Sequence, residues 1–267
     1  MDLYALTAAR AGLWLLFLMR ASGFMFFAPL LSTRVSPPQL RIALAFFLAL
    51  IGYIAWGPML ATPQEVTIAW FVPAAVSELM LGLILGYLVG LVFAAFQYAG
   101  QLIGYQMGFA VVNVLDPHTQ NQVSLIGEFL FAVVMLAFLS MNLHHDMLGL
   151  WYESYRIAPP GAFSFAGIAA AHSAYLPALT AACADLFYLA LKIAMPLLAF
   201  LLLTDLALGI VARVMPQLNV FIVGIPLKVA VGLFFLSMVV LQFDPAVHQS
   251  MVRYINHAGA MLHALAT

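Results

Sequence analysis

Residues 77–108 read SELMLGLILGYLVGLVFAAFQYAGQLIGYQMG, an apolar run in which glycine recurs at every fourth position in two separate sets. The sets are named here the first glycine strip (Gly82, Gly86 and Gly90) and the second glycine strip (Gly100, Gly104 and Gly108). At 3.6 residues per turn each strip lies along one face of a helix, and the second strip is rotated from the first by about 80 degrees. Small residues let a neighbouring backbone approach closely in a membrane, where lipid gives helices no hydrophobic drive to associate. The two strips therefore predict close helix packing on two different faces.

The composition extends the membrane interpretation to the whole chain. The 267 residues are 66% hydrophobic and only 7% charged, whereas soluble domains are roughly 25% charged. Because so few charges cannot cover a water-exposed surface, we expect the chain among lipids and apolar helices. A formal net charge of −1 offers no basic surface for nucleic acid. The single cysteine, Cys183, lies in an apolar run, which favours a small buried side chain over a disulfide or a metal ligand.

Six stretches approach the length of about 20 apolar residues that a membrane-spanning helix needs. They are residues 12–31, 40–56, 71–96, 124–142, 183–211 and 220–243. Prolines and glycines separate several of them, because proline cannot donate to the helical ladder and restricts the residue before it. We predict an all-α integral membrane bundle of about six hydrophobic helices built of helical hairpins. Lys and Arg are evenly divided between the loops of the two sides, so the orientation stays open.

Both ends of the chain carry further predictions. The N-terminal stretch has no Lys or Arg before its first apolar residues, and we predict that it is retained rather than cleaved as a signal peptide. The C-terminal tail is predicted to form a short amphipathic helix that packs on the bundle. Its apolar face comprises Val247, Met251, Tyr254, Ile255, Met261 and Leu262. A membrane-surface anchor is the less favoured alternative, because the polar face has a single arginine.

Several ionisable residues fall inside the predicted spans, and each costs about 2.5–3.5 kcal/mol at the middle of the bilayer unless it finds a partner or water. They are Arg20, Glu78, Glu128, Asp185, Lys192, Asp205 and Lys228. Asp185 and Lys192 share one helix face, and Asp205 faces Lys228 if the last two spans form an antiparallel hairpin. Two explanations remain open: a relay in an ion-coupled transporter, or burial in a subunit of a larger complex.

Residues 104–122, GYQMGFAVVNVLDPHTQNQ, interrupt the apolar spans with amides and an Asp-Pro break but no Lys or Arg. Irregular backbone at membrane depth must be buried in protein or line an aqueous cavity, so the segment indicates the border of a pore. A lining of amides and small aliphatic residues suits a conduit for unfolded chains of varied sequence. The alternative is a polar loop outside the membrane that merely connects two helices.

Five strings of the chain are similar to those of a known family. They are APLLSTRVSPPQLRIALA (28–45), SELMLGLILGYLVGLVFAAFQYAGQLIGYQMG (77–108), LDPHTQNQVSLIGEFL (115–130), FLSMNLHHDML (138–148) and DLALGIVARVMPQLNVFIVGIPLKVAVGL (205–233). In this order and spacing they resemble the FliR/SctT family of type III export-gate subunits. AGQLIGYQMG followed by LDP resembles the flagellar members more than the injectisome members.

The resemblance implies a transport subunit without catalysis in the bacterial inner membrane, at the flagellar basal body. Such subunits assemble with FliP-like and FliQ-like subunits into a closed helical cone at the entrance of the export channel, beside FlhB-like and FlhA-like components, and unfolded flagellar proteins pass through. Much of this assembly lies above the membrane plane, so not every span need cross lipid. The resemblance also implies a FliP-like part at 1–175, with a loop at 97–123, and a FliQ-like hairpin with the tail at 176–267.

The family segment that corresponds to residues 105–115 implies an inner plug of the channel. Carried over to this sequence, the plug candidates are Gln106, Met107, Phe109, Val111, Asn113 and Val114. Val111 and Val114 stand where some relatives have bulkier aromatic residues. The seal is therefore expected to depend more on Met107 and Phe109.

Catalysis finds no support in the sequence. His144 and His145 are adjacent in NLHHD and point about 100 degrees apart on a helix, and no second histidine completes an H-E-x-x-H site. Ser164 lacks a G-x-S-x-G context, and no phosphate-binding loop appears. We predict no enzyme activity, no metal and no cofactor. The alternatives to a flagellar export-gate subunit are its injectisome counterpart and an ion-coupled secondary transporter that uses Glu78, Asp205 and Lys228.

Overall fold

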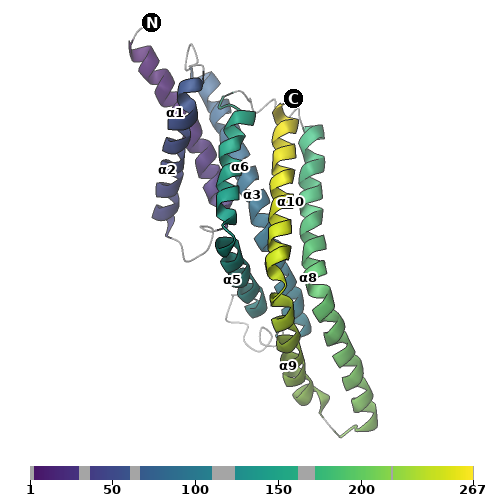
Figure 1. The fold of residues 1–267 in the computed structure, drawn as a ribbon. Helices are drawn as coiled ribbons and strands as arrows, with labels where there is room; N and C mark the ends of the chain where they lie inside the picture. Colours follow the sequence, from purple (N-terminus) through teal and green to yellow (C-terminus); the bar gives the residue numbers. More distant parts are fainter. Residues whose placement is uncertain are drawn as a thin grey trace. The chain divides into compact units, whose positions relative to one another are not determined.

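The fold is described from a computed structural model that covers residues 3–29, 37–60, 67–109, 124–161, 172–217 and 219–266 (Figure 1). Within these ranges the regular secondary structure is entirely helical. The elements are α1 (Leu3–Phe27), α2 (Pro38–Trp56), the short 3-10 helix η1 (Gly57–Met59), α3 (Ile68–Gln106), α5 (Leu125–Ser140), α6 (Leu143–Ile157), α8 (His172–Val214), α9 (Val220–Val240) and α10 (Phe243–Ala266). The predicted all-α class is confirmed.

Five of the predicted spans correspond to helices that are long and apolar enough to cross a membrane. These are Ala9–Phe27, Pro38–Met59, Ile68–Gln106, Leu176–Val214 and Ile222–Val240. The remaining predicted span, 124–142, falls on α5, which has only 16 residues. It reaches spanning length only together with α6, from which it is bent by 75°. Asn142 stands at the bend with φ 56°, a left-handed conformation that asparagine tolerates better than most residues.

The helix α3 is longer than predicted. It continues past Phe96 to Gln106, so the first part of the loop predicted at 97–123 is helical. The remainder, residues 110–123, lies outside the described residues. Glutamines at positions 97, 101 and 106 lower the hydropathy and so end the apolar run. They do not interrupt helical hydrogen bonding, because glutamine is a good helix former.

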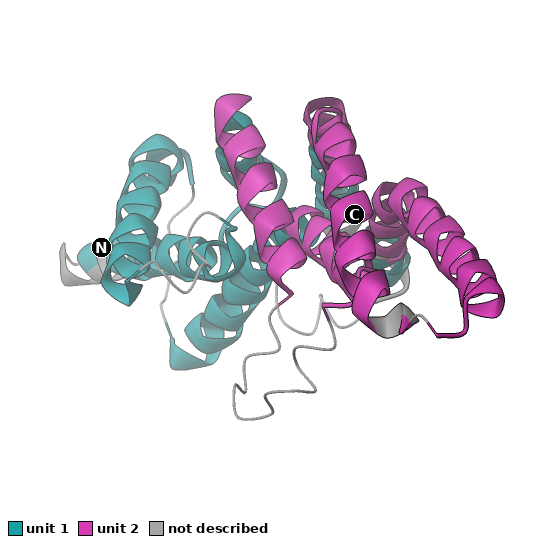
Figure 2. Cartoon of the chain, turned by 90° about the horizontal axis from the view of Figure 1, so that it is seen from below, with its two compact units in different colours: residues 1–91, 142–183, 251–267 teal, residues 92–141, 184–250 magenta. Residues whose placement is uncertain are grey.

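The chain divides into two compact units (Figure 2). Unit 1 comprises residues 1–91, 142–183 and 251–267, and unit 2 comprises residues 92–141 and 184–250. The helices α3, α8 and α10 each contribute residues to both units.

In unit 1, α1 lies along the first glycine strip of α3. A Cβ atom on Gly82 would lie 2.1 Å from the carbonyl oxygen of Arg20, and one on Gly23 would lie 2.4 Å from that of Leu79. A Cβ on Gly86 would lie 2.5 Å from the carbonyl oxygen of Phe24. Because real Cβ atoms do not approach a backbone oxygen this closely, both helices need glycine at the crossing.

In unit 2, the start of α5 lies along the second glycine strip. A Cβ atom on Gly100 would lie 2.6 Å from the Cα of Gly127, and one on Gly104 would lie 3.0 Å from Oγ of Ser124. Ser124 caps α5 by accepting a hydrogen bond from the backbone N–H of Gly127 at 3.1 Å, which satisfies a donor that the first helical turn leaves free. The first glycine strip therefore faces α1, whereas Gly100 and Gly104 of the second strip face α5.

The predicted tail helix is confirmed as α10, which runs from Phe243 to Ala266. Its predicted apolar face includes five buried side chains, Val247, Met251, Tyr254, Met261 and Leu262. In unit 1 the hydroxyl of Tyr254 donates to the carbonyl oxygen of Ala182 on α8 at 3.0 Å. This contact fixes the second half of α10 against the first part of α8.

The candidate spans differ greatly in burial. In its most apolar window α3 is 61% buried, whereas the windows of α2 and α9 are each 17% buried. The exposed faces carry large apolar side chains, for example Ile42 on α2, Leu206 on α8 and Phe234 on α9. Such surfaces in a chain of this composition contact lipid or other protein.

Candidate functional site: the C-terminal end of α3

The helix α3 ends in a Schellman motif, a hydrogen-bonded turn that closes a helix with a left-handed residue. Gly108 has φ +91° and its N–H donates to the carbonyl oxygen of Tyr105 at 3.1 Å. The N–H of Phe109 donates to the carbonyl oxygen of Gly104, also at 3.1 Å. Glycine carries no penalty in this conformation, so the sequence stops the helix at Gly108. The break thus comes well before the Asp-Pro pair at residues 116 and 117.

Met107 and Gly108 at this helix end pack against α9 of unit 2. Met107 is fully buried. A Cβ atom on Gly232 would lie 2.7–2.8 Å from three atoms of the Met107 side chain, and a Cβ on Gly108 would lie 3.8 Å from the side chain of Ile225. The absence of a side chain at Gly232 therefore makes the space that Met107 fills.

Gln106, one residue earlier, belongs to a polar cluster with α8 and α9. Its Nε2 donates to Oδ2 of Asp205 at 2.9 Å. The other carboxylate oxygen of Asp205 forms an ion pair with Nζ of Lys228. Because the side chains of Lys228 and Asp205 are only 22% and 37% exposed, this pair is partly desolvated. The pairing predicted across the antiparallel hairpin is present in the structure.

The other plug candidates have different positions. Phe109 follows the Schellman turn and is half-buried. Val111, Asn113 and Val114 lie outside the described residues. Further back on α3, Nε2 of Gln97 donates to Oε1 of Glu128 on α5 at 3.0 Å, in an exposed position. Gln97 and Gln106 therefore each donate a hydrogen bond to a carboxylate on a neighbouring helix.

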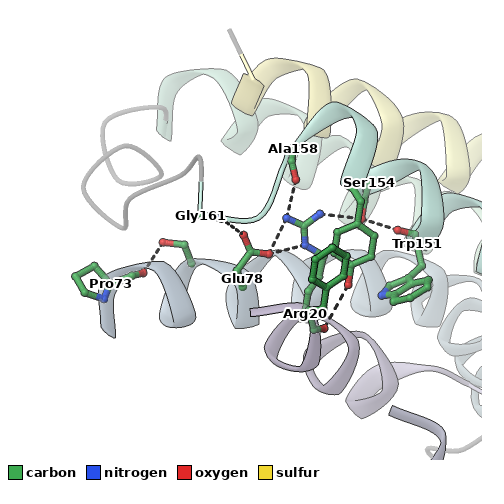
Figure 3. A network of polar contacts seen from close by, with 10 residues as sticks. Arg20, Pro73, Glu78, Trp151, Ser154, Ala158 and Gly161 are labelled. Atoms are coloured by element: carbon green, nitrogen blue, oxygen red, sulfur yellow. Dashed lines mark hydrogen bonds and ion pairs between the residues drawn. The ribbon is translucent and has the colours of Figure 1, made fainter. Parts of the chain in front are cut away.

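A second polar network lies in unit 1, where Arg20 and Glu78 are both completely buried (Figure 3). Oε2 of Glu78 accepts from Nε of Arg20 at 2.7 Å and pairs with Nη2 at 2.6 Å. Oε1 accepts the N–H of Gly161 at 3.1 Å. Every oxygen of the buried carboxylate therefore has a partner, as burial of a charge requires.

Both terminal nitrogens of the Arg20 guanidinium make further contacts. Nη1 donates to Oγ of Ser154 at 3.1 Å, and Nη2 donates to the carbonyl oxygen of Ala158 at 2.8 Å. Its guanidinium carbon lies 4.4 Å above the ring of Tyr155, a cation–π distance. The network joins α1 to α3, to α6 and to the turn that follows α6. It stabilises the packing of unit 1, since both of its charged side chains are fully buried.

Sequence reasoning identified Arg20 and Glu78 as ionisable residues inside spans but did not pair them. The positions of the charges in the sequence show how far along its own helix each residue lies. They do not show which helices are neighbours. Of the other candidates, Glu128 and Lys192 are exposed and Asp185 is half-buried. Among the residues that the structure describes, His, Cys, Asp and Glu form no group of three or more that would hold a metal ion.

The apolar spans and the glycine packing define an integral membrane protein of the all-α class, a helical bundle in which α3 contacts its neighbours through glycine. Residues 11–253 match the family described as "Bacterial export proteins, family 1". The chain is 39% identical over 226 residues, 84% of each chain, to the "Flagellar biosynthetic protein FliR" of Bacillus subtilis (strain 168). It is 31% identical over 217 residues to the protein of the same name from Escherichia coli (strain K12), covering 81% of this chain and 79% of the relative.

A further relative is named for protein translocation. The chain is 26% identical over 196 residues, 70% of each chain, to the "Yop proteins translocation protein T" of Yersinia pestis. The chain belongs to the bacterial export proteins, family 1, which is the FliR/SctT family indicated by its sequence motifs. It is accordingly a membrane subunit of a type III export apparatus.

Proposed function

We propose that the chain is the FliR-type subunit of a flagellar export gate in the bacterial inner membrane. It assembles with FliP-like and FliQ-like subunits, beside FlhB-like and FlhA-like components, and unfolded flagellar proteins pass through the assembly. The observation that carries the proposal is the higher identity to relatives named for flagellar biosynthesis than to the Yop translocation protein. The large apolar side chains exposed on α2, α8 and α9 support assembly with other subunits.

We propose further that the end of α3 belongs to the plug of the channel. The described plug residues are Gln106, Met107 and Phe109, and the candidate set continues with Val111, Asn113 and Val114. Within the described part, the segment contains no charged residue of its own and ends in a closed turn. An uncharged, firmly anchored obstruction excludes ions without binding a passing polypeptide strongly.

Gene deletion and complementation test the flagellar assignment. Deletion is expected to abolish filament assembly and swimming, and complementation with the chain is expected to restore both. The tagged chain is expected to co-purify with two other small membrane proteins in one stable complex. Normal swimming after deletion would overturn the proposal.

The injectisome function is the second candidate, and the similarity to the Yop translocation protein favours it. It predicts loss of effector delivery to host cells after deletion, with swimming intact. The ion-coupled transporter lacks comparable support, because both carboxylate oxygens of Glu78 already accept hydrogen bonds within unit 1. A transported ion would have to displace Arg20.

A further inference from the structure

One face of α9 in unit 2 contacts the last residues of α3. The export function and the list of plug candidates assign no role to this face of α9. Ile225, Lys228 and Gly232 are spaced by three and four residues, so they lie on a common face of the helix. Ile225 is the nearest neighbour of Gly108, Lys228 pairs with the carboxylate that binds Gln106, and Gly232 adjoins Met107. We name these three residues and Asp205 of α8 the α3 seat.

Shape complementarity in the seat depends on Gly232. Three atoms of the Met107 side chain occupy the position where a Cβ would stand, at 2.7–2.8 Å. Met107 has no exposed surface. A methyl group at position 232 would therefore force the methionine to change rotamer or α3 to move away from α9.

The charge of Asp205 in the seat is balanced by Lys228. Asp205 accepts the amide hydrogen of Gln106 while its other oxygen pairs with Lys228. Loss of the ammonium would leave a partly buried carboxylate without a countercharge at the point where three helices meet. Because one carboxylate joins α3, α8 and α9, a shift of α9 along α8 would disturb the ion pair and the Gln106 contact together.

We propose that the α3 seat is a positioning surface that fixes the C-terminal end of α3 and thereby sets how tightly the export channel is closed. The inference rests on the proposed function, in which the end of α3 belongs to the plug. Its residues act through Gln106, Met107 and Gly108. The hairpin of α8 and α9 thus has a direct mechanical connection to the plug.

The test is ion conductance of the purified, fully assembled complex in planar bilayers, with assembly checked by co-purification of all subunits. Lys228→Met is expected to raise conductance of the closed complex by up to about fivefold, the factor that corresponds to the loss of one partly exposed ion pair. Gly232→Ala is expected to raise conductance as well, because the added methyl group displaces Met107. Lys228→Arg retains the charge and is expected to stay near the wild type. Gly149→Ala is the matched glycine control, because nothing lies within 4 Å of a Cβ there.

Exchange of the two charges gives a readout that general destabilisation would not reproduce. Lys228→Asp and Asp205→Lys are each expected to raise conductance, whereas the double variant is expected to return it toward the wild type. In the double variant the amide of Gln106 can turn its oxygen to accept from the new ammonium. A double variant that leaks as much as the single ones, in complexes assembled at the normal level, would overturn the inference.

The inference and the proposed function fail in different ways. If removal of residues 107–114 raises conductance but Lys228→Met and Gly232→Ala do not, the plug stands and the α3 seat is refuted. If removal of residues 107–114 also has no effect, the plug itself is refuted, and the seat with it.

Discussion

Arg20 on α1 and Glu78 on α3 form an ion pair, with 2.6 Å between Nη2 and Oε2, in which neither side chain has any exposed surface. A pair of this kind is expensive to bury, and only complete hydrogen bonding makes it tolerable. Ser154, Ala158 and Gly161 supply the remaining partners. The network therefore fixes which faces of α1, α3 and α6 meet in unit 1.

Removal of one partner of this pair is predicted to be far more harmful than removal of both. Arg20→Met or Glu78→Gln leaves an uncompensated buried group and is expected to lower the free energy of unfolding by about 3–5 kcal/mol. The double variant Arg20→Met with Glu78→Met is expected to recover part of this loss. Denaturant titration of the purified chain in detergent micelles measures both quantities.

The exposed pair of Arg156 and Glu153 provides the control. Nη2 of Arg156 lies 2.8 Å from Oε2 of Glu153, but the side chains of Arg156 and Glu153 are 65% and 47% exposed. Glu153→Gln is expected to change the free energy of unfolding by less than about 1 kcal/mol. Equal losses for Glu78→Gln and Glu153→Gln would contradict the role given to the buried network.

The first glycine strip predicts a graded response to alanine. A Cβ at Gly82 would lie 2.1 Å from a backbone oxygen of α1, at Gly86 2.5 Å, and at Gly90 3.4 Å. Because backbone cannot yield as a side chain does, Gly82→Ala and Gly86→Ala are expected to push α1 away, and Gly90→Ala is expected to be tolerated. Thermal unfolding in detergent should rank the three variants in this order of decreasing damage.

Gly149→Ala serves as the reference for the strip, because its Cβ would meet nothing within 4 Å. It is expected to be neutral or stabilising by up to about 1 kcal/mol, since alanine is the better helix former. If Gly90→Ala proved as damaging as Gly82→Ala, close contact along the strip would not be the cause.

The turn at Gly108 predicts a different ranking, set by backbone conformation. At φ +91° an alanine is strained, and Gly108→Ala is expected to weaken the turn by about 1–2 kcal/mol. Gly108→Asn is expected to be milder, because asparagine adopts positive φ more readily. Hydrogen exchange at the amides of residues 108 and 109, which close the Schellman motif, measures the effect locally. Unchanged protection in Gly108→Ala would show that the turn is not needed to end α3.

The sequence predicted much of this fold because hydropathy and glycine spacing are local properties. The helical spans, the tail helix and the rotation between the two glycine strips follow from periodicity along one helix. The Lys228–Asp205 pair could be predicted as well, because only residues 215–219 separate α8 from α9 in the sequence. Adjacency in sequence thus carried the prediction.

Contacts between distant segments could not be predicted, because hydropathy and glycine spacing are local properties. Arg20, Glu78 and Ser154 meet only through the packing of α1, α3 and α6, and no periodicity encodes that. The glutamines near the end of α3 were mistaken for the start of a loop, because polarity and helix termination are separate properties. Gly108, rather than the Asp-Pro pair, ends the helix. The role of Gly232 depends on the position of Met107, which the sequence does not reveal.

The central claim is that the end of α3 helps to close a protein-conducting channel, and single-channel recording tests it most directly. Complexes assembled with the full chain and with a chain lacking residues 107–114 are compared in planar bilayers at equal subunit content. We predict a closed, nearly ion-tight complex for the full chain and a steady ion leak for the shortened one. Equal, low conductance for both complexes would contradict the account.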